Sequence, residues 1–242
     1  MTGADSGLPA GRIVPLASCA LRLDPAPHAL ETAAGAEIDA NWVAEKQARP
    51  AIHDGKVALF SRLSWDGAAL AGTCHIVRYA TFLYWRGGGR RAMARHLYAH
   101  AVLAAADGPL VAVRMGGHTV NAGRVYFAAG SLETVDFRDG FADLDANMRR
   151  EVMEETGLDL AGAHADPSLH ALALDSGTVV LRRYVSPLPA AEIVARVAAH
   201  VAAEAEPEIE GAVIIDGPRT GPANLAPQMP AIIDWHFANP PS

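Results

Sequence analysis

Cysteine is nearly absent from this chain of 242 residues, which has only Cys19 and Cys74. The two do not form a Cys-x-x-Cys pair, so the sequence supports neither a disulfide framework nor a zinc site. Neither lies in a recognisable nucleophile setting, and no Gly-x-Ser-x-Gly segment is present, so covalent hydrolysis has no support. Because structural disulfides mark oxidising compartments, we expect a cytoplasmic protein.

Long apolar runs are also missing. The longest candidates, residues 99–106 and 197–203, are far shorter than the roughly 20 residues that a membrane-spanning helix needs. The first 24 residues do not join a basic start to an apolar run, and glycine and proline interrupt them at Gly7, Pro9, Gly11 and Pro15. We therefore expect no signal peptide and no membrane partner.

Positive charge is in deficit, with 20 Lys and Arg against 27 Asp and Glu and a formal net charge of -7. An acidic chain repels the phosphates of nucleic acid, so we expect no nucleic-acid partner. A small phosphorylated ligand is not excluded, because a bound divalent cation reverses the local field. Half of the residues are apolar, which is enough for a sizeable core.

The chain divides best at its triple glycine, Gly87 to Gly89, which is followed by two arginines. We expect a β-containing extension over residues 1–92 and the main domain over residues 93–242. In the extension the patterns predict a loose tail over 1–10, strands over 13–23 and 56–63, a turn at Asp66-Gly67, and helices over 38–49 and 79–85.

In the main domain, apolar runs alternate with turn signals. We expect strands over 100–105, 110–115, 125–128, 169–174, 178–184 and 211–215, and helices over 145–156, 189–204 and 230–237. Asp145 is the expected N-cap of the first helix, and Gly157 follows its end. Because strands and helices intermix, the fold class is α/β or α+β.

One expected helix ends in Arg150-Glu151-Val152-Met153-Glu154-Glu155-Thr156-Gly157-Leu158. At 100° per residue, Glu151, Glu154 and Glu155 fall within roughly a 100° arc of one face. Like charges this close cost about 0.2–0.5 kcal/mol for each pair, so the cluster needs a counter-charge. Arg150 supplies part of it, and carboxylate oxygens are ligands that magnesium and calcium prefer. A solvated acidic helix face is the alternative.

The order of these residues resembles the core of the Nudix box, Arg-Glu-apolar-x-Glu-Glu-x-Gly-apolar, and every fixed position is met. The resemblance implies an α/β/α sandwich with a mixed sheet, and an enzyme that hydrolyses a phosphoanhydride bond in a nucleoside diphosphate linked to another moiety. Glu151, Glu154 and Glu155 would bind Mg²⁺ or Mn²⁺, and Arg150 would orient a glutamate. Sugar nucleotides, ADP-ribose and dinucleotides are the implied substrates, and a homodimer is left open.

The loop side of the box departs from the family pattern, Gly-x5-Glu-x7-Arg-Glu. Gly130, followed by Glu133, looks like its start, but Gly130 lies 20 residues before Arg150 instead of 14. The position eight before Arg150 is Ala142, so the first glutamate has no match there. Glu133, Asp139 or Asp143 substitutes for it, or that ligand is absent.

Looser similarities at residues 54–57, 79–86, 117–127 and 139–144 extend the resemblance to a bacterial Nudix subgroup with an extended box loop and an N-terminal extension. A general base is expected at Glu154 or Glu155, or among Glu206, Glu208 and Glu210, although a solvated loop is the favoured interpretation of those last three.

Several other residues have an ordinary structural interpretation. The Gly87 to Gly89 segment lacks Walker spacing and is interpreted as a linker, although Arg90, Arg91 or Arg95 could touch a phosphate. His96, His100 and His118 are spaced too irregularly for a metal site, with His100 interpreted as a hydrogen-bonded core residue. Core packing is favoured over base stacking for the aromatic residues Trp42, Trp65, Tyr79 and Trp85.

Two rival functions remain. A Nudix-fold nucleotide-binding or regulatory module without catalysis would explain the stretched loop and Ala142. A structural helix in an unrelated domain is the third reading, and it predicts that magnesium affects neither stability nor ligand binding.

Overall fold

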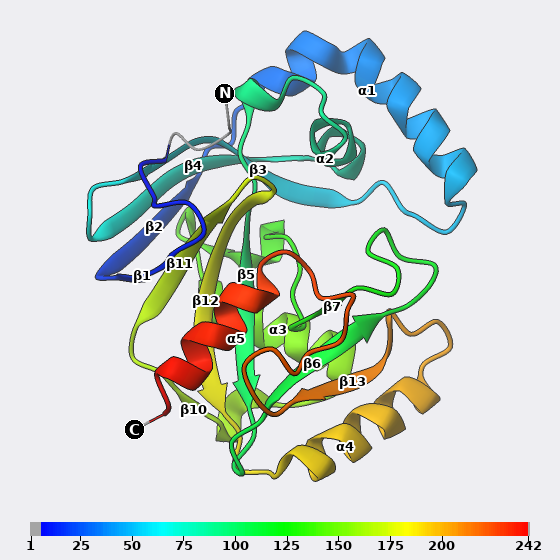
Figure 1. Cartoon of the computed structure of the whole chain (residues 1–242). Coiled ribbons are helices and arrows are strands. Elements are labelled where there is room, and N and C mark those ends of the chain that lie inside the picture. Colours follow the sequence, from blue (N-terminus) through cyan, green and yellow to red (C-terminus); the bar gives the residue numbers. More distant parts are fainter. Residues whose placement is uncertain (1–5, 242) are drawn as a thin grey trace.

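The computed structural model describes residues 6–241, which fold into two mixed β-sheets and five α-helices (Figure 1). The prediction of an α/β protein is confirmed. The expected loose tail is described only from Ser6 onward, and there it is packed, because Ser6 and Leu8 are buried and Ala10 pairs with Ala173. None of the helices in residues 6–241 is long and apolar enough to cross a bilayer.

The larger sheet has the strand order β1, β11, β12, β5, β6, β13, with β10 beside β12 and β7 beside β6. Only β12 and β5 run parallel, so the sheet is mixed, as expected. The strands are β1 (Ile13–Leu16), β5 (Leu97–Ala104), β6 (Leu110–Met115), β7 (Val125–Tyr126), β10 (His164–Ala165), β11 (Leu169–Leu174), β12 (Gly177–Val185) and β13 (Ile209–Ile215).

The smaller sheet has the order β3, β4, β2, β9, β8. Its strands are β2 (Ser18–Leu23), β3 (Lys56–Trp65), β4 (Ala69–Arg78), β8 (Phe137–Arg138) and β9 (Phe141–Ala142). The expected turn joins β3 to β4: Asp66 Oδ1 accepts from the backbone N–H groups of Ala68 and Ala69, and Gly67 adopts a φ of 105°. Such a positive φ favours glycine because a Cβ would clash there.

Helices α1 (Ala29–Ala48) and α2 (Tyr79–Arg86) cover the smaller sheet at the top of Figure 1. Helices α3 (Leu144–Thr156) and α4 (Ala190–Ala203) pack on one face of the larger sheet, and α5 (Met229–Ala238) packs on the other. Successive side chains of β5 point to opposite faces of the sheet and so contact both helical layers. Ala101 and Leu103 face Val152 of α3, while His100 faces Gln228 at the start of α5. The expected α/β/α sandwich is confirmed.

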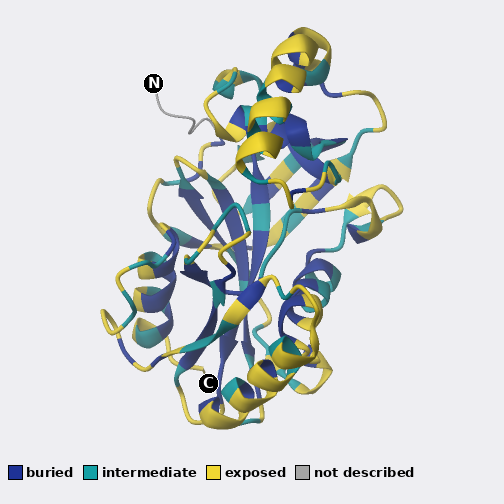
Figure 2. Cartoon of the chain, turned by 90° about the vertical axis from the view of Figure 1, so that its right-hand side faces the viewer, coloured by how far each residue is buried: buried dark blue, intermediate teal, exposed yellow. Residues whose placement is uncertain are grey.

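A continuous apolar core joins the two sheets. Phe60 and Leu70 of the smaller sheet are fully buried in the same cluster as Leu97 and Leu110 of the larger one. Burying one such side chain stabilises the fold by about 1.5–3 kcal/mol. Figure 2 shows buried residues along the strands and the inner helix faces, with exposed residues on the outer faces. A second cluster lies under α1 and α2.

Each of the two sheets contains strands from both sides of the expected division between residues 92 and 93. Strand β1 belongs to the larger sheet, and strands β8 and β9, from the other side of the division, belong to the smaller sheet. The domain boundary itself stays a prediction. The two parts are called below the N-terminal unit (residues 6–92) and the main unit (residues 93–241).

Four element predictions need correction. Residues 13–23 form two strands in different sheets, because the chain bends at Ala17, whose N–H bonds to the Ala68 carbonyl. Helix α1 begins nine residues earlier than expected, where the ring of His28 accepts from the Leu30 N–H, and it is broken at Ala34. The N-cap of α3 is Asp143, not Asp145. The strand expected over 125–128 ends at Tyr126.

Candidate functional site

A cleft of about 1160 Å³ lies between the N-terminal unit and the main unit. The N-terminal unit contributes residues of α2 and of the segment leading into β3, and the main unit contributes residues of β5, α3 and five loops. The lining combines carboxylates with aromatic and basic side chains. The part that holds the glutamates is called below the carboxylate end, and it contains Glu133, Glu151, Glu154, Glu155, Glu204, Glu206 and Glu208.

Helix α3 brings Glu151, Glu154 and Glu155 to the cleft, as the spacing predicts. Glu151 and Glu155 are each only 8% exposed, whereas the side chain of Glu154 is 58% exposed. The helix ends where expected, because Gly157 adopts the left-handed conformation with a φ of 70° and its N–H bonds to the Met153 carbonyl. The three carboxylates therefore share one short stretch of wall.

Arg150 is saturated by carboxylates. Its Nη2 lies 2.6 Å from Glu151 Oε1, its Nη1 lies 2.7 Å from Glu154 Oε2, and Asp136 accepts from its Nε and Nη2 at 3.2 and 3.0 Å. Burial alone disfavours the charged guanidinium, but the bonds to Asp136 and the surrounding negative charges outweigh it and raise the pKa of Arg150. Arg150 thus holds acidic side chains in place and has little capacity left for a ligand.

The two buried glutamates are poorly compensated. Burial, opposed by the charge of Arg150 and reinforced by that of Glu154, raises the pKa of Glu151 to about 7. Burial and then the charge of Glu151 raise the pKa of Glu155 well above its usual range. Oε1 of Glu155 accepts from the Ala129 N–H at 3.2 Å, but its Oε2 is buried without a hydrogen-bond partner. An unpaired buried oxygen is costly, and a cation would relieve it.

The donor set fits a hard divalent cation, which prefers carboxylate oxygens. In residues 6–241, however, no three His, Cys, Asp or Glu side chains converge closely enough to enclose an ion. The reason is local: Glu151 and Glu154 turn toward Arg150, and Glu155 turns toward Ala129. A cation at these glutamates would therefore compete with Arg150 for their oxygens.

Gly130 lies directly against Glu151. A Cβ at position 130 would lie 2.4 Å from the Glu151 carboxylate, so any other residue there would displace this carboxylate from its present position. Glu133, three residues further on, lines the cleft, and burial raises the pKa of its carboxyl. Of the three proposed substitutes for the missing glutamate, Glu133 lines the cleft, Asp143 caps α3, and Asp139 lies in an exposed turn with a φ of 50°.

Asp136 is the residue that the sequence analysis missed. It lies six positions after Gly130, the spacing of Gly-x5-Glu, and it is 2% exposed and bonded to Arg150. The six extra residues follow it and form the β8–β9 hairpin, in which Arg138 pairs with Phe141. Counting forward from Gly130 instead of backward from Arg150 would have found this acid.

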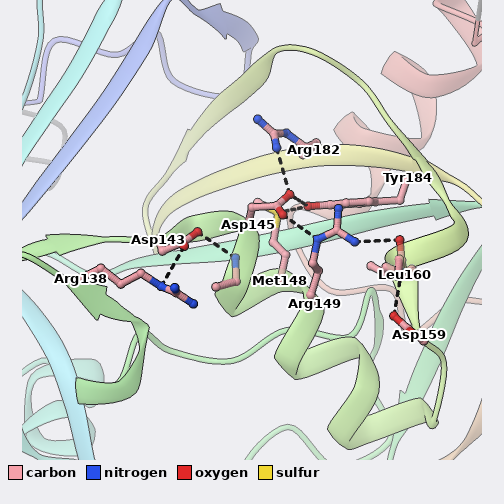
Figure 3. Close-up of polar contacts among 11 residues, drawn as sticks. Arg138, Asp143, Asp145, Met148, Arg149, Asp159, Leu160, Arg182 and Tyr184 are labelled. Atoms are coloured by element: carbon pink, nitrogen blue, oxygen red, sulfur yellow. Dashed lines mark hydrogen bonds and ion pairs between the residues drawn. The ribbon is translucent and has the colours of Figure 1, made fainter.

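A polar cluster fixes the back of α3 (Figure 3). Asp145 accepts from Arg149 Nε at 2.6 Å, from Arg182 Nη1 at 2.9 Å and from the Tyr184 hydroxyl at 2.5 Å. Arg149 also donates to the Leu160 carbonyl at 2.8 Å. Because Arg182 and Tyr184 belong to β12, these bonds tie the helix to the sheet and set the direction in which its glutamates point.

The three glutamates at positions 206, 208 and 210 differ in their placement. Glu206 and Glu208 line the cleft, and the charge of Glu208 contributes, after burial and the charge of Glu151, to the raised pKa of Glu155. Glu210 is not part of the cleft and lies 4.0 Å from Arg114. All three are exposed. The expected solvated loop holds Glu206 and Glu208, which border the carboxylate end, whereas Glu210 lies in β13, which begins two residues earlier than expected.

The three predicted histidines all line the cleft. His100 is buried and bonded to the Gln228 amide at 3.1 Å, as predicted for a core residue, and burial lowers its pKa to about 4. His96 contacts Ser131 Oγ at 3.1 Å, and burial followed by the charges of Arg86 and Arg91 lowers its pKa to about 3. Burial therefore favours the neutral form of both histidines, and only His96 also has arginine charges nearby.

The remaining candidates are mostly structural. Trp85 is buried, with Nε1 bonded to the carbonyls of Arg91 and Ala94, but it also lines the cleft with Tyr79. Arg91 borders the cleft, Arg90 pairs with Glu37, and Arg95 bonds to backbone carbonyls. Trp42 and Trp65 pack against the two apolar clusters. Cys19 and Cys74 are free thiols whose pKa is raised to about 12 by burial.

Comparison with known proteins gives similar structures but no similar sequences. No protein-family profile and no curated protein matches the chain. DR0079 from Deinococcus radiodurans is 16% identical with a TM-score of 0.35, over 50% of this chain and 67% of that one. The MutT protein from Methanosarcina mazei Go1 is 19% identical with a TM-score of 0.29, over 38% and 63%. The E. coli ORF135 protein is 17% identical with a TM-score of 0.36, over 61% and 94%.

Proposed function

We propose that this chain is a Nudix hydrolase that uses Mg²⁺ or Mn²⁺ to hydrolyse a phosphoanhydride bond in a nucleoside diphosphate linked to another moiety. The motif at residues 150–158 supports this proposal, together with the sandwich fold in which its helix borders a large cleft. Sugar nucleotides, ADP-ribose and dinucleotides are the substrate classes to test first. A cytoplasmic location and the absence of nucleic-acid and membrane partners belong to the same proposal.

The observation that carries the proposal is the state of Glu155. Its carboxyl is buried beside Glu151, and one oxygen has no partner. A buried, unpaired carboxylate costs several kcal/mol unless it is neutralised. Binding a divalent cation is the function that makes this arrangement favourable, and the cleft beside it has room for a nucleotide derivative.

The protein's own groups have distinct tasks in this proposal. Glu151, Glu154 and Glu155 would hold the metal, which when bound neutralises phosphate charge and lowers the pKa of water. Asp136 and Arg150 keep these carboxylates in position. A carboxylate must also accept the proton of the attacking water, and the glutamates of the cleft offer it: Glu154, Glu155, Glu206 and Glu208.

The proposal is tested with purified protein, a panel of sugar nucleotides, ADP-ribose, NADH, CoA derivatives and nucleoside triphosphates, and assays with and without metal. We expect phosphate-containing products only when Mg²⁺ or Mn²⁺ is present. Glu154→Gln should remove most of the activity while the fold survives, because Glu154 is exposed and its loss leaves no cavity. Glu192→Gln is the matched control, since Glu192 forms the same i,i+4 pair with an arginine on α4. Turnover by Glu154→Gln at the wild-type rate would contradict the proposal.

A binding or regulatory module without catalysis is the second candidate. The observation that favours it is the engagement of the three glutamates by Arg150 and Ala129, which leaves no converged set of ligands in residues 6–241. This alternative predicts that nucleotides raise the melting temperature without product formation. Release of products by the wild-type protein would exclude it.

A further inference from the structure

The cleft contains a cationic side chain that the proposed metal chemistry does not use. Arg86 is the last residue of α2, in the N-terminal unit, and its guanidinium lines the cleft opposite the main unit. Its Nη2 donates to Asn121 Oδ1 at 2.7 Å, and it forms no ion pair with any carboxylate in residues 6–241. A guanidinium has five N–H donors, so most of those of Arg86 are free.

Arg86 is held beside the carboxylate end. Asn121, which accepts from Arg86, donates through its Nδ2 to the Tyr126 hydroxyl at 3.0 Å. The charge of Glu155 reaches Tyr126: after burial, it is the next cause of the raised pKa of the Tyr126 hydroxyl. Arg86, Asn121 and Tyr126 therefore form a chain of hydrogen bonds from α2 to β7, and all three residues line the same cleft as Glu155.

The charge of Arg86 is felt throughout this part of the cleft. Burial is the main cause of the lowered pKa of His96, and the charge of Arg86 lowers it further. Burial raises the pKa values of Tyr79, Tyr98 and Tyr126, and the charge of Arg86 opposes that rise. Arg86 itself is exposed, and the ring side chains of His96, Tyr79, Tyr98 and Tyr126 line the same cleft.

Other cations of the cleft are less suited to the same task. Arg150 is saturated by Asp136, Glu151 and Glu154. Arg91 is occupied, because it lies over the Trp85 ring at 4.1 Å and donates to the Asp175 carbonyl. Lys56 and Arg124 also border the cleft, but they form no side-chain hydrogen bond in residues 6–241 that would hold their position. Arg86 is the cation that is both available and fixed.

We propose that Arg86 and Asn121 form an anion subsite in which the guanidinium binds a phosphoryl oxygen of the substrate's diphosphate, from the side opposite the α3 glutamates. The inference rests on the proposed function. Its physical reason is that a diphosphate entering this end meets several carboxylates, and a metal ion on α3 neutralises only that wall. A fixed guanidinium on the opposite wall supplies the second positive group and a directional pair of donors.

The test compares Arg86→Gln with Arg90→Gln, the matched control on the same segment, whose arginine pairs with Glu37 outside the cleft. We expect Arg86→Gln to raise KM about 10- to 100-fold with little change in kcat, because a charged hydrogen bond is lost from substrate binding. Arg90→Gln should match the wild type. Arg86→Lys should recover part of the loss, since it keeps the charge but not the fork of donors.

A binding measurement separates this inference from the proposed function. Calorimetric titration with α,β-methylene-ADP and Mg²⁺ requires no turnover, and Arg86→Gln should raise the Kd by a similar factor. If the wild type hydrolyses substrate but Arg86→Gln leaves both KM and this Kd unchanged, the subsite is wrong and the proposed function stands. If no compound is hydrolysed, the proposed function fails and the Kd comparison still decides the subsite.

Asn121→Ala provides an independent variant should Arg86→Gln fold poorly. It leaves Arg86 in the chain but removes the group that holds the guanidinium, so the expected rise in KM is smaller and in the same direction. Unchanged KM and Kd in Asn121→Ala and Arg86→Lys would overturn the inference. Thermal unfolding of each variant identifies any loss of folded protein.

Discussion

At the scale of single residues, the buried glutamates of α3 connect stability to function. In the folded chain Glu151 has a pKa of about 7 against an ordinary 4.5, and that of Glu155 is higher than usual for the same main reason, burial. Both groups therefore bind protons in the folded state that the unfolded chain has already released. Folding is favoured by this effect at low pH and opposed by it as the pH rises.

The first prediction concerns the pH dependence of stability without metal. Since the folded pKa is raised, the free energy of unfolding should fall as the pH rises from about 4.5 through about 7 and beyond, by roughly 3 kcal/mol for a shift of this size. Urea unfolding in EDTA at several pH values measures the slope. Glu155→Gln should flatten it, and saturating Mg²⁺ should reverse the decline in the wild type. Parallel slopes for Glu155→Gln and wild type would contradict the prediction.

The second prediction concerns the contact between Gly130 and Glu151. In Gly130→Ala the new methyl group overlaps the end of the Glu151 side chain, which is flexible enough to swing away. We expect hydrolytic activity to fall sharply while the midpoint of urea unfolding changes little. Gly117→Ala is the control, because a Cβ there meets nothing within 4 Å. Equal activity in the two variants would show that the position of Glu151 is not critical.

At the scale of elements, the orientation of α3 depends on bonds to neighbouring elements. Asp143 caps the helix by accepting from the Ala146 N–H, and Asp145 joins it to Arg182 and Tyr184 of β12. The helix carries the glutamates on one side and these anchors near its start, so disturbing an anchor should affect both stability and metal binding.

The third prediction follows from the anchor at Asp145. Asp145→Ala leaves the Tyr184 hydroxyl and two arginines without their acceptor, and we expect a loss of about 1–3 kcal/mol in the free energy of unfolding. The apparent affinity for Mg²⁺ should also fall, because the helix is less firmly oriented. Chemical denaturation and metal titration by calorimetry measure the two effects. Asp159→Ala, which removes only a local bond to the Ala161 N–H, is the comparison and should change the metal affinity little.

The sequence predicted elements whose signals are local. Gly157 ends α3 as expected because a positive φ favours glycine, and the Asp66-Gly67 turn follows from the same chemistry. The break at Ala17 was missed because apolar residues continue on both sides of it, and only tertiary pairing assigns the two strands to different sheets. Asp136 was missed because the spacing was counted backward from Arg150, across the inserted hairpin, instead of forward from Gly130. The cleft was missed because it requires the relative placement of two units.

At the scale of the whole molecule, the two units are interleaved. Strand β1 completes the edge of the larger sheet, strands β8 and β9 extend the smaller one, and Phe60 of β3 is buried in the shared core. Cutting the chain at the expected boundary would expose both the core and the open edge of β11. Exposed edges of this kind promote association between chains.

The fourth prediction is that the chain unfolds as one cooperative unit. Calorimetry should give a single transition whose calorimetric and van't Hoff enthalpies agree. The fragment 93–242 produced alone should be aggregated or unfolded, because it lacks β1 and the side chains that cover its core. A soluble, folded fragment with its own transition would instead support two independent domains.

The hairpin formed by β8 and β9 closes on itself, because the backbone N–H of Asp143 bonds to the carbonyl of Asp136 at 2.7 Å. Its two ends are therefore neighbours whatever lies between them. The distance in space between Asp136 and α3 therefore does not depend on the number of residues between them. Asp136 can keep its bonds to Arg150 while the segment between Asp136 and Asp143 lengthens or shortens. Natural variation in this protein's relatives should consequently accumulate at residues 137–142 as insertions and deletions that leave the chemistry of α3 untouched.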